Sequence, residues 1–266
     1  MYYVSKEDMY KIAPIFNGWS KTMIWSCLQG YMGNAWADDI QKPKSAQIII
    51  GDFCFFAGVP NLDLVKNIPD YYTTPSILMV PGSNEWGILI EGEYKNKCHK
   101  FMRYSFKKEP DVFDIDKLKA YINSLSKEFI IQKIDEEQFY NVKREEWSKD
   151  LCSQFSSYEH YDKLGHGFVV THNSIIVCGA SSYTVYDKGI EIEIDTKKEY
   201  RRKGLAIACA SKLILECLNN GIYPSWDSAN RESAALALKL GYHFESEYVT
   251  YSVKNVKIDK SLYEIT

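Results

Sequence analysis

The sequence lacks the clustered cysteines and histidines from which proteins build metal centres and disulfide frameworks. Its seven cysteines stand singly, include no C-x-x-C pair and are odd in number, and its five histidines are equally dispersed. Structural zinc sites need closely spaced thiolate or imidazole ligands, and disulfide-rich folds usually carry an even number of cysteines. We therefore expect no metal, and we expect reduced thiols that pack as small apolar groups.

Long apolar runs and an excess of basic residues are also missing. No stretch approaches the roughly 18 apolar residues of a membrane-spanning helix, and the opening MYYVSKEDMYKIAPIF carries charges where a signal peptide needs an apolar run. The formal net charge is -3, whereas nucleic-acid-binding proteins usually carry a marked excess of lysine and arginine. These absences predict a cytoplasmic protein with no membrane and no nucleic acid among its partners.

Proline is nearly absent from the second half of the chain. Seven of the eight prolines lie at or before Pro110, and only Pro224 follows. The 266 residues suffice for two ordinary domains, and the 45% of hydrophobic residues suffice for their cores. The change in composition, and the charge-rich stretch that begins at Asp135, place the expected boundary near residue 130. No internal repeat is visible in the sequence.

The segment 1–130 predicts an α/β domain without recognisable chemistry of its own. Residues 18–29 form a helical pattern that ends at a glycine, and 114–125 form another that begins at an Asp cap. Short apolar runs indicate strands, and the longest run is broken near Gly51. The strands expected in and just after this segment cover 46–57, as one strand or a strand pair, and 77–80, 86–90, 101–106 and 129–134.

The segment 131–266 predicts a three-stranded meander followed by a buried helix, a strand, a second helix and a final strand. Polar and glycine-containing turns separate the strands of the meander. The helix after them is apolar around nearly its whole circumference, so it must be covered on most sides. The elements expected are helices over 135–150, 151–157, 205–218 and 231–240, and strands over 167–170, 174–185, 190–195, 223–226 and 242–253.

A basic turn with one glycine separates the strand at 190–195 from the buried helix. It reads Arg-Arg-Lys-Gly-Leu-Ala over residues 201–206. Free N–H groups at the start of a helix, and the positive end of the helix dipole, bind phosphate oxygens. A side chain larger than that of Gly204 would block the approach. The turn therefore predicts an anion site, although a solvated basic cap has the same composition.

The hexapeptide RRKGLA resembles the pyrophosphate-binding signature of the GNAT superfamily of N-acetyltransferases, which reads Gln or Arg, two residues, Gly, one residue, then Gly or Ala. The following YPSWDSANRESAALALKLGY is similar to the next strand and helix of that fold, with Asn230 in the usual Asn position. The Trp-Asp-x-x-Asn and Leu-Ala-x-Lys-Leu-Gly variants, with the WSKDL and GHGF stretches, most resemble the zwittermicin A resistance acetyltransferases. The resemblance covers 131–266 as the acetyltransferase domain and 1–130 only as an accessory region.

The resemblance implies a GNAT fold of the α/β type, with a mixed, mostly antiparallel sheet flanked by helices. It implies acetyl-CoA as co-substrate, and as acceptor a primary amine of a small molecule, such as an antibiotic or metabolite, that attacks the thioester directly. The pyrophosphate would lie on the amides of 201–206, and the pantetheine would pair like a strand with 194–196. The coenzyme-binding residues implied in this way are Ile194, Asp195, Thr196, Arg201, Arg202, Lys203, Gly204, Leu205, Ala206, Asn230 and Ser233.

A row of acidic residues on the strand before the turn offers a base for the amine. Because alternate residues of a strand share a face, Glu191, Glu193 and Asp195 point one way while the intervening isoleucines point into the core. A carboxylate there can take the proton from the incoming ammonium, and a strand-end amide near Ile194 or Thr196 can stabilise the oxyanion. Glu191 is the first candidate and Glu193 the second, and the alternative for each is a solvated strand face.

One family feature is missing. The tyrosine that many members use as a general acid, seven residues after the Asn, is replaced by Ala237. A thiol with a pKa of about 8.5 can leave as thiolate, or take a proton from water or from Tyr242. Two functions therefore stay open: an amine N-acetyltransferase, and a catalytically degenerate domain that binds acetyl-CoA as a sensor or scaffold, which Ala237 favours.

Acidic residues beside aromatic ones offer a cation-favouring rim for the acceptor. These groups are Asp38-Asp39 beside Trp36, and Glu159-His160 beside Tyr158 and Tyr161. Ordinary surface and core packing explains the same residues more simply. The sequence is compatible with a homodimer, and it defines neither the oligomeric state nor the amine.

Overall fold

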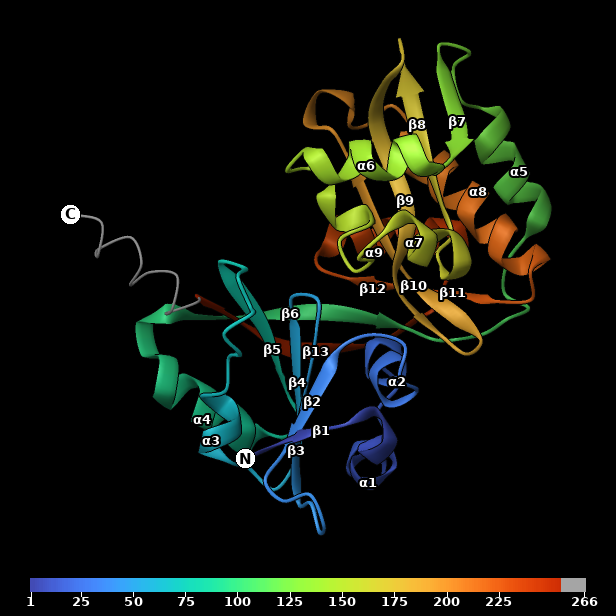
Figure 1. Ribbon diagram of the computed structural model, residues 1–266. Coiled ribbons are helices and arrows are strands. Elements are labelled where there is room, and N and C mark those ends of the chain that lie inside the picture. The colour runs from blue at the N-terminus through green and yellow to red at the C-terminus, as the bar shows by residue number, and fades with distance from the viewer. Residues whose placement is uncertain (255–266) are drawn as a thin grey trace. The chain divides into compact units, whose positions relative to one another are not determined.

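The computed structural model describes residues 1–254 and divides them into two compact units (Figure 1). The first unit holds Met1–Arg103 and the described residues from Glu247 onward, and the second holds Tyr104–Ser246. This division falls between residues 103 and 104, whereas the expected boundary lies near residue 130. The last strand, β13 (Phe244–Lys254), joins the first unit because it returns to pair with β5 (Ser76–Pro81). Residues 255–266 of the expected second domain lie outside the described residues.

The first unit is a mixed sheet with short helices. Its strands are β1 (Tyr2–Val4), β2 (Asn34–Ala37), β3 (Ser45–Ile50), β4 (Phe53–Gly58), β5, β13 and β6 (Cys98–Phe106). Its α-helices are α1 (Met9–Ile12), α2 (Thr22–Leu28), α3 (Leu62–Val65) and α4 (Asn84–Tyr94). The strand order of the sheet is β1-β2-β3-β4-β5-β13-β6-β12, antiparallel from β1 to β4 and parallel between β4 and β5. The short strand β12 (Asp227–Ser228) pairs with the end of β6.

The second unit has a sheet of its own, ordered β11-β10-β9-β8-β7. Its strands are β7 (Phe129–Lys133), β8 (Gly167–His172), β9 (Ile175–Tyr186), β10 (Gly189–Thr196) and β11 (Tyr223–Ser225). Its helices are α5 (Ile115–Asn123), α6 (Glu136–Arg144), α7 (Tyr158–Leu164), α8 (Leu205–Asn219) and α9 (Arg231–Leu240). All neighbouring strands are antiparallel except β10 and β11. The expected mixed, mostly antiparallel sheet flanked by helices is confirmed.

The two units repeat one order of elements. Apart from the two-residue strand at 227–228, each runs strand, helices, three-stranded meander, helix, strand and helix, and in each the third meander strand pairs in parallel with the strand after the following helix. In the first unit this parallel pair is β4 and β5, and in the second it is β10 and β11. A repeat that the sequence does not reveal is therefore present in the fold.

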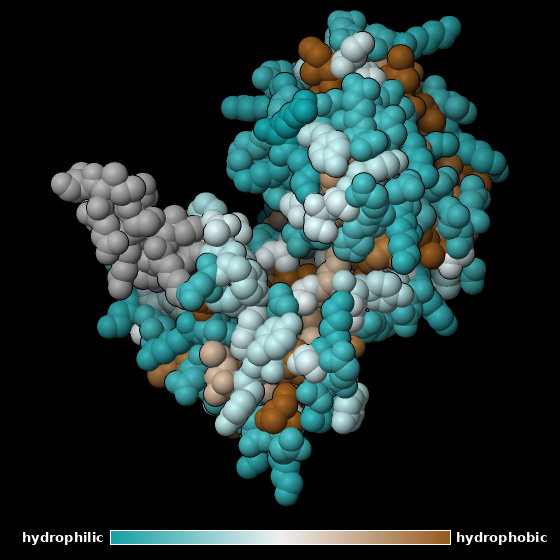
Figure 2. Space-filling view, in the orientation of Figure 1, coloured by the Kyte–Doolittle hydropathy of each residue, from teal (hydrophilic) through white to brown (hydrophobic). Residues whose placement is uncertain are grey.

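Helix α8 is the central helix of the second unit because both of its sides are covered. One side packs on β8, β9 and β10, and α5 packs against α8 as well. Leu213, Ile214 and Cys217 are fully buried, as the apolar circumference predicts. Figure 1 shows α6 and α7 on the opposite face of the sheet. The side of the unit that carries α6 and α7 is mainly hydrophilic in Figure 2.

Two element predictions are wrong. Residues 86–90, expected as a strand, lie inside α4, where Trp86, Ile90 and Tyr94 recur every fourth position and are buried. Residues 151–157, expected as a short helix, form turns between the 3-10 turn η4 (Lys149–Leu151) and α7. The strand pair within 46–57 is confirmed as β3 and β4, and the expected Asp cap of α5 is Asp114, which accepts from the Lys117 N–H.

The structure bears on the expectations for cysteines, metal sites and membrane spans. All seven cysteines are free, and six are buried, while Cys98 is half-buried. Over residues 1–254, no group of three or more His, Cys, Asp or Glu side chains has a metal-binding arrangement. Within the same residues, none of the helices combines the length and the apolar character needed to span a bilayer.

Candidate functional site

The parallel strands β10 and β11 separate after a short pairing, and we call the point of separation the fork. They pair from Gly189 opposite Tyr223 to Glu191 opposite Ser225, where β11 ends. Strand β10 continues to Thr196 while paired on its other side with β9. Beyond the fork, one edge of β10 therefore runs without β11 beside it, and an extended ligand can pair with such an edge.

The amide groups on this open edge belong to the residues that the sequence analysis assigns to pantetheine. The Lys197 N–H donates to the Val177 carbonyl of β9 at 2.9 Å. Because amide groups alternate in direction along an antiparallel strand, those of Ile194 and Thr196 point away from β9. The Thr196 N–H lies 2.6 Å from Asp195 Oδ1 and donates to it, so Ile194 supplies the N–H for a ligand at this edge.

The start of α8 is formed by a glycine in the left-handed conformation, and like the starts of α1, α2 and α4 it has no side-chain cap among the described residues. Gly204 occupies the N-cap position with φ +79°, and no side chain among the described residues caps the helix. The first helical bond joins the Ala208 N–H to the Gly204 carbonyl at 3.2 Å, so the amides of residues 205–207 precede the helical ladder. Side chains that cap other helices are those of Asn61, Asp114, Asp135, Ser157 and Asn230.

The turn before α8 is shaped to present backbone N–H groups. Arg202 has φ +62° and Gly204 has φ +79°, and left-handed residues within a turn create a concave nest of N–H groups that favours anions. A Cβ added at Gly204 meets nothing within 4 Å, so the space over the helix start is open. The positive φ explains why glycine stands there.

Arg201 ties this turn to the open strand edge. Its Nε donates to the Thr196 carbonyl at 3.0 Å, and its Nη2 lies 3.4 Å from Asp195 Oδ1. Lys203 Nζ lies 4.9 Å from the centroid of the Tyr200 ring. Arg201 therefore holds the start of α8 next to the end of β10. The contact with Tyr200 keeps the Lys203 ammonium group near the same turn.

The two faces of β10 are assigned by their neighbours. On one face, Thr196 Oγ1 donates to Cys178 Sγ at 3.2 Å, and Cys178 in turn adjoins Cys209 of α8. On the other face, Gly179 lies so close to Leu151 that a Cβ would collide with it, and Gly179 is the partner of Asp195. Because side chains alternate along a strand, Glu193 and Asp195 face the η4 side and Ile194 faces α8.

Glu191 lies at the fork itself. Its side chain is 6% exposed, and it is opposite Ser225 on β11 and Thr184 on β9. Burial raises the pKa of the Tyr223 hydroxyl to about 12 and raises that of Tyr186, and the charge of Glu191 adds to both shifts. The carboxylate is thus held among tyrosines at the end of the open edge. Glu193 is half-buried and lies opposite Ser181.

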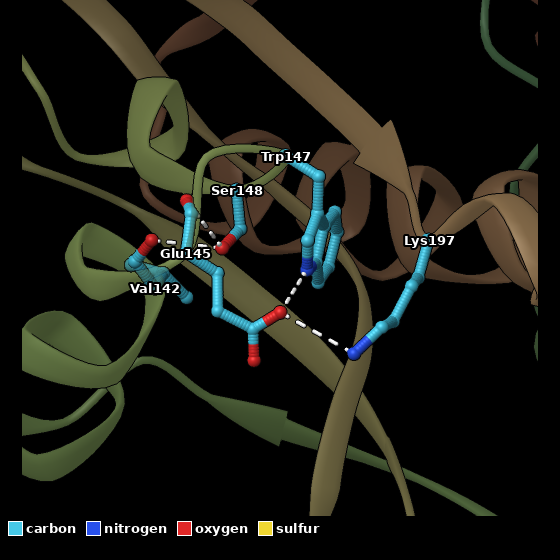
Figure 3. A network of polar contacts seen from close by, with 5 residues as sticks. All are labelled: Val142, Glu145, Trp147, Ser148 and Lys197. Atoms are coloured by element: carbon cyan, nitrogen blue, oxygen red, sulfur yellow. Dashed lines mark hydrogen bonds and ion pairs between the residues drawn. The ribbon is translucent and has the colours of Figure 1, made fainter.

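A polar network that the sequence analysis does not identify fixes the segment between α6 and η4 to β10 (Figure 3). Glu145 Oε2 accepts the indole N–H of Trp147 at 2.6 Å and forms an ion pair with Lys197 Nζ at 3.3 Å. Ser148 Oγ donates to the Val142 carbonyl at 2.8 Å. Lys197 directly follows β10, so this network holds the segment that leads into η4 next to the open end of β10. The only sequence signal was the WSKDL stretch.

The remaining predicted site residues have structural tasks. Asn230 caps α9 by accepting from the Ser233 N–H at 2.9 Å, and Ser233 Oγ donates to Ser228 Oγ at 3.2 Å. Ala237 is fully buried. Tyr242 is also buried and donates to the Pro224 carbonyl at 2.6 Å, and burial raises its pKa, so its proton is not readily released.

The proposed cation-favouring rim consists of turn and cap residues. Asp39 Oδ1 accepts two backbone N–H groups, from Gln41 at 2.6 Å and Lys42 at 2.8 Å, and these bonds lower the pKa of Asp39. Asp38 accepts from the backbone of Lys44 and Ser45. In the second group, a hydrogen bond with Ser157 at the start of α7 lowers the Glu159 pKa, and the His160 ring lies 5.3 Å from that of Phe155. Packing explains both groups.

In the first unit, the point that corresponds to the fork is where the parallel strands β4 and β5 separate, and there the side chain of Trp86 covers the end of β4. Trp86 is fully buried, stacks on Phe56 at 5.0 Å and donates its indole N–H to the Gly58 carbonyl at the end of β4 at 3.0 Å. The helix that follows β4 is the single turn α3, whose first amides are taken by the Asn61 side chain. Among the described residues, Trp86 therefore covers the end of β4 and Asn61 caps the helix start at this counterpart.

Comparison with known proteins agrees with this geometry. The family model described as GNAT acetyltransferase matches residues 13–251. The chain is 32% identical to the uncharacterized N-acetyltransferase YdfB of Bacillus subtilis, over 93% of this chain and 97% of YdfB. It is 41% identical to a GCN5-related N-acetyltransferase-like protein from Streptococcus suis, whose crystal structure matches with a TM-score of 0.88 over 93% of this chain and 99% of that one.

A more distant solved structure bears on the repeated fold. A tandem GNAT protein from the clavulanic acid biosynthesis pathway matches over 95% of this chain and 98% of its own, with a TM-score of 0.54 and 7% identity. At that identity the likeness concerns the fold alone, and it agrees with two similar units in one chain.

Proposed function

The chain belongs to the GNAT acetyltransferase family, and we propose that it transfers the acetyl group of acetyl-CoA to a primary amine of a small molecule by direct attack. The observation that carries this proposal is the uncapped start of α8 beside the open edge of β10. One feature suits a diphosphate and the other suits the amides of pantetheine. Arg201 joins the two at a fixed distance.

The coenzyme would bind along residues 194–206. Its diphosphate would accept N–H groups of the turn 201–206, with Arg202 and Lys203 supplying positive charge, and its pantetheine would pair with Ile194, Asp195 and Thr196. Asn230 and Ser233 would contribute through the start of α9. The second unit is then the acetyltransferase domain, and the first unit is the accessory one.

The transfer requires one proton acceptor and one hydrogen-bond donor. The Glu191 carboxylate, or Glu193 in second place, would take a proton from the acceptor's ammonium group, and the neutral nitrogen would attack the thioester carbonyl carbon. The Ile194 N–H would stabilise the negative charge on the carbonyl oxygen. The C–S bond then breaks, and coenzyme A leaves as thiolate, which needs no acid at the position of Ala237.

We propose a class of acceptor from the resemblance to one subgroup of the family. We place the chain with the zwittermicin A resistance acetyltransferases, so amino-containing antibiotics and metabolites are the acceptors of choice. The rival function, coenzyme binding as a sensor or scaffold, is favoured by Ala237 alone. Thiol release from acetyl-CoA over a broad panel of primary amines separates the two: turnover supports the enzyme, and tight coenzyme binding without turnover on any amine supports the rival.

We predict that one chain binds one coenzyme A, although the fold contains two similar units. The counterpart site in the first unit is filled by Trp86 and capped by Asn61. Isothermal titration of the full chain with coenzyme A should give a stoichiometry of one. A stoichiometry of two would contradict the assignment of the coenzyme to the second unit alone.

A further inference from the structure

Three buried polar residues form a row across the sheet at the fork. Ser225 on β11, Glu191 on β10 and Thr184 on β9 are neighbours in register, and they are 1%, 6% and 0% exposed. Residues opposite one another on adjacent strands point to the same face, with Cβ atoms roughly 5 Å apart. We call this set the polar row. A bulge of β9 lies next to it, between the pairs Glu191–Thr184 and Ile192–Ser182.

Thr184 is the unexplained member of the polar row. Its Oγ1 is buried and has no hydrogen-bond partner among the described residues. Ser225 Oγ, in contrast, is 2.9 Å from the Tyr186 hydroxyl. Leaving a buried hydroxyl unsatisfied costs about 1–3 kcal/mol, so such a group calls for an explanation. A ligand with an N–H group at the fork would satisfy it.

The position of the polar row matches the end of the proposed coenzyme path. Pantetheine that pairs with β10 from Ile194 toward Ile192 ends at Glu191, because β11 closes the edge from there on. The reactive thioester would therefore lie next to the polar row. Thr184 and Glu191 are neighbours in register on β9 and β10 at that point.

We propose that Thr184 is a further positioning residue for the acceptor, with its Oγ1 accepting one N–H group of the primary amine beside Glu191. This inference rests on the proposed function and names one residue of the acceptor site within it. An alkylammonium group has three N–H donors. Glu191 takes the proton of one, Thr184 accepts a second, and the freed lone pair is thereby directed at the thioester carbon. The bond changes are those of the transfer itself: C–N forms, C–S breaks and the thiolate leaves.

The test compares Thr184→Val, which has the same shape without the hydroxyl, with Thr184→Ser, which keeps the hydroxyl. Thiol release from acetyl-CoA is measured with putrescine, tyramine and D-glucosamine as acceptors. We expect Thr184→Val to lower kcat/KM for the amine at least tenfold with an unchanged Kd for coenzyme A, and Thr184→Ser to restore kcat/KM to within about threefold of wild type. Because the valine removes an unsatisfied buried hydroxyl, the Tm should not fall.

Thr250→Val is the matched control. Thr250 is likewise fully buried with an unpartnered Oγ1, but it lies on β13 in the first unit, and its substitution should leave kcat/KM unchanged. A Thr184→Val protein that turns over amines within twofold of wild type, or that loses activity only together with several degrees of Tm, would overturn the role of Thr184 while the proposed function stands. A wild-type protein that binds acetyl-CoA and acetylates none of the amines would instead overturn the proposed function.

Discussion

Replacement of Gly204 by valine should abolish coenzyme binding while the chain still folds. A valine at φ +79° is strained, and its side chain would fill the open space over the first amides of α8, where no protein atom lies within 4 Å of the added Cβ. We expect the Kd for coenzyme A, measured by isothermal titration, to rise at least 100-fold, which corresponds to about 2.7 kcal/mol. The stabilisation by acetyl-CoA in a thermal melt should vanish with it.

Gly221→Val is the matched control for this substitution. Gly221 follows the other end of α8, has φ +67°, and likewise has nothing within 4 Å of an added Cβ. Its valine variant should carry a similar backbone strain and bind coenzyme A like wild type. Equal affinity of Gly204→Val and Gly221→Val would refute the placement of the diphosphate at the start of α8.

Replacement of Glu191 by glutamine should remove the base and leave the coenzyme site intact. Glutamine has the same size as glutamate and fits the buried position between Thr184 and Ser225. Loss of general-base catalysis typically costs about 100- to 10,000-fold, so we expect kcat to fall by that factor with the Kd of coenzyme A unchanged.

Glu193→Gln is the comparison that decides between the two carboxylates. Glu193 is half-buried and lies farther along the open edge, opposite Ser181. We expect its glutamine variant to lose less activity than Glu191→Gln in the same thiol-release assay. The reverse order would assign the base to Glu193, and full activity in both variants would place the proton transfer elsewhere.

Elements whose signals are local could be predicted from the sequence. Helix α5 follows the cap Asp114, α9 ends at Gly241 in the left-handed conformation, and the apolar pattern of α8 reports its burial on both sides. Helix α4 was misread as a strand because its apolar run is short and continuous. Its helical form is stabilised by packing of Trp86 and Ile90 in the core of the first unit, a tertiary effect that no local pattern reports.

The basic turn before α8 could be recognised from the sequence for the same reason, and the fork could not. A glycine between basic residues and a buried helix is a contiguous signal with a direct physical meaning. The fork depends on where β11 stops pairing with β10, and the neighbourhood of Thr184 and Glu191 depends on the register of β9. Pairing between separate strands cannot be derived from one strand's own residues.

Sequence analysis did not detect the repeat because the two units have the same order of strands and helices but different residues at corresponding positions. The segment after β4 contains Pro60 and the cap Asn61, whereas the segment after β10 contains the basic turn with Gly204. Burial patterns tolerate extensive substitution, so the same fold can persist after its sequence signal is lost. The difference between the two segments is also what limits the proposed coenzyme site to the second unit.

A crystal structure of the protein with bound coenzyme A tests the central proposal most directly. We predict diphosphate oxygens within hydrogen-bonding distance, about 3 Å, of the backbone N–H groups of residues 204–206, with the pantetheine beside Ile194. A diphosphate bound elsewhere, with the start of α8 covered by other protein atoms, would contradict it.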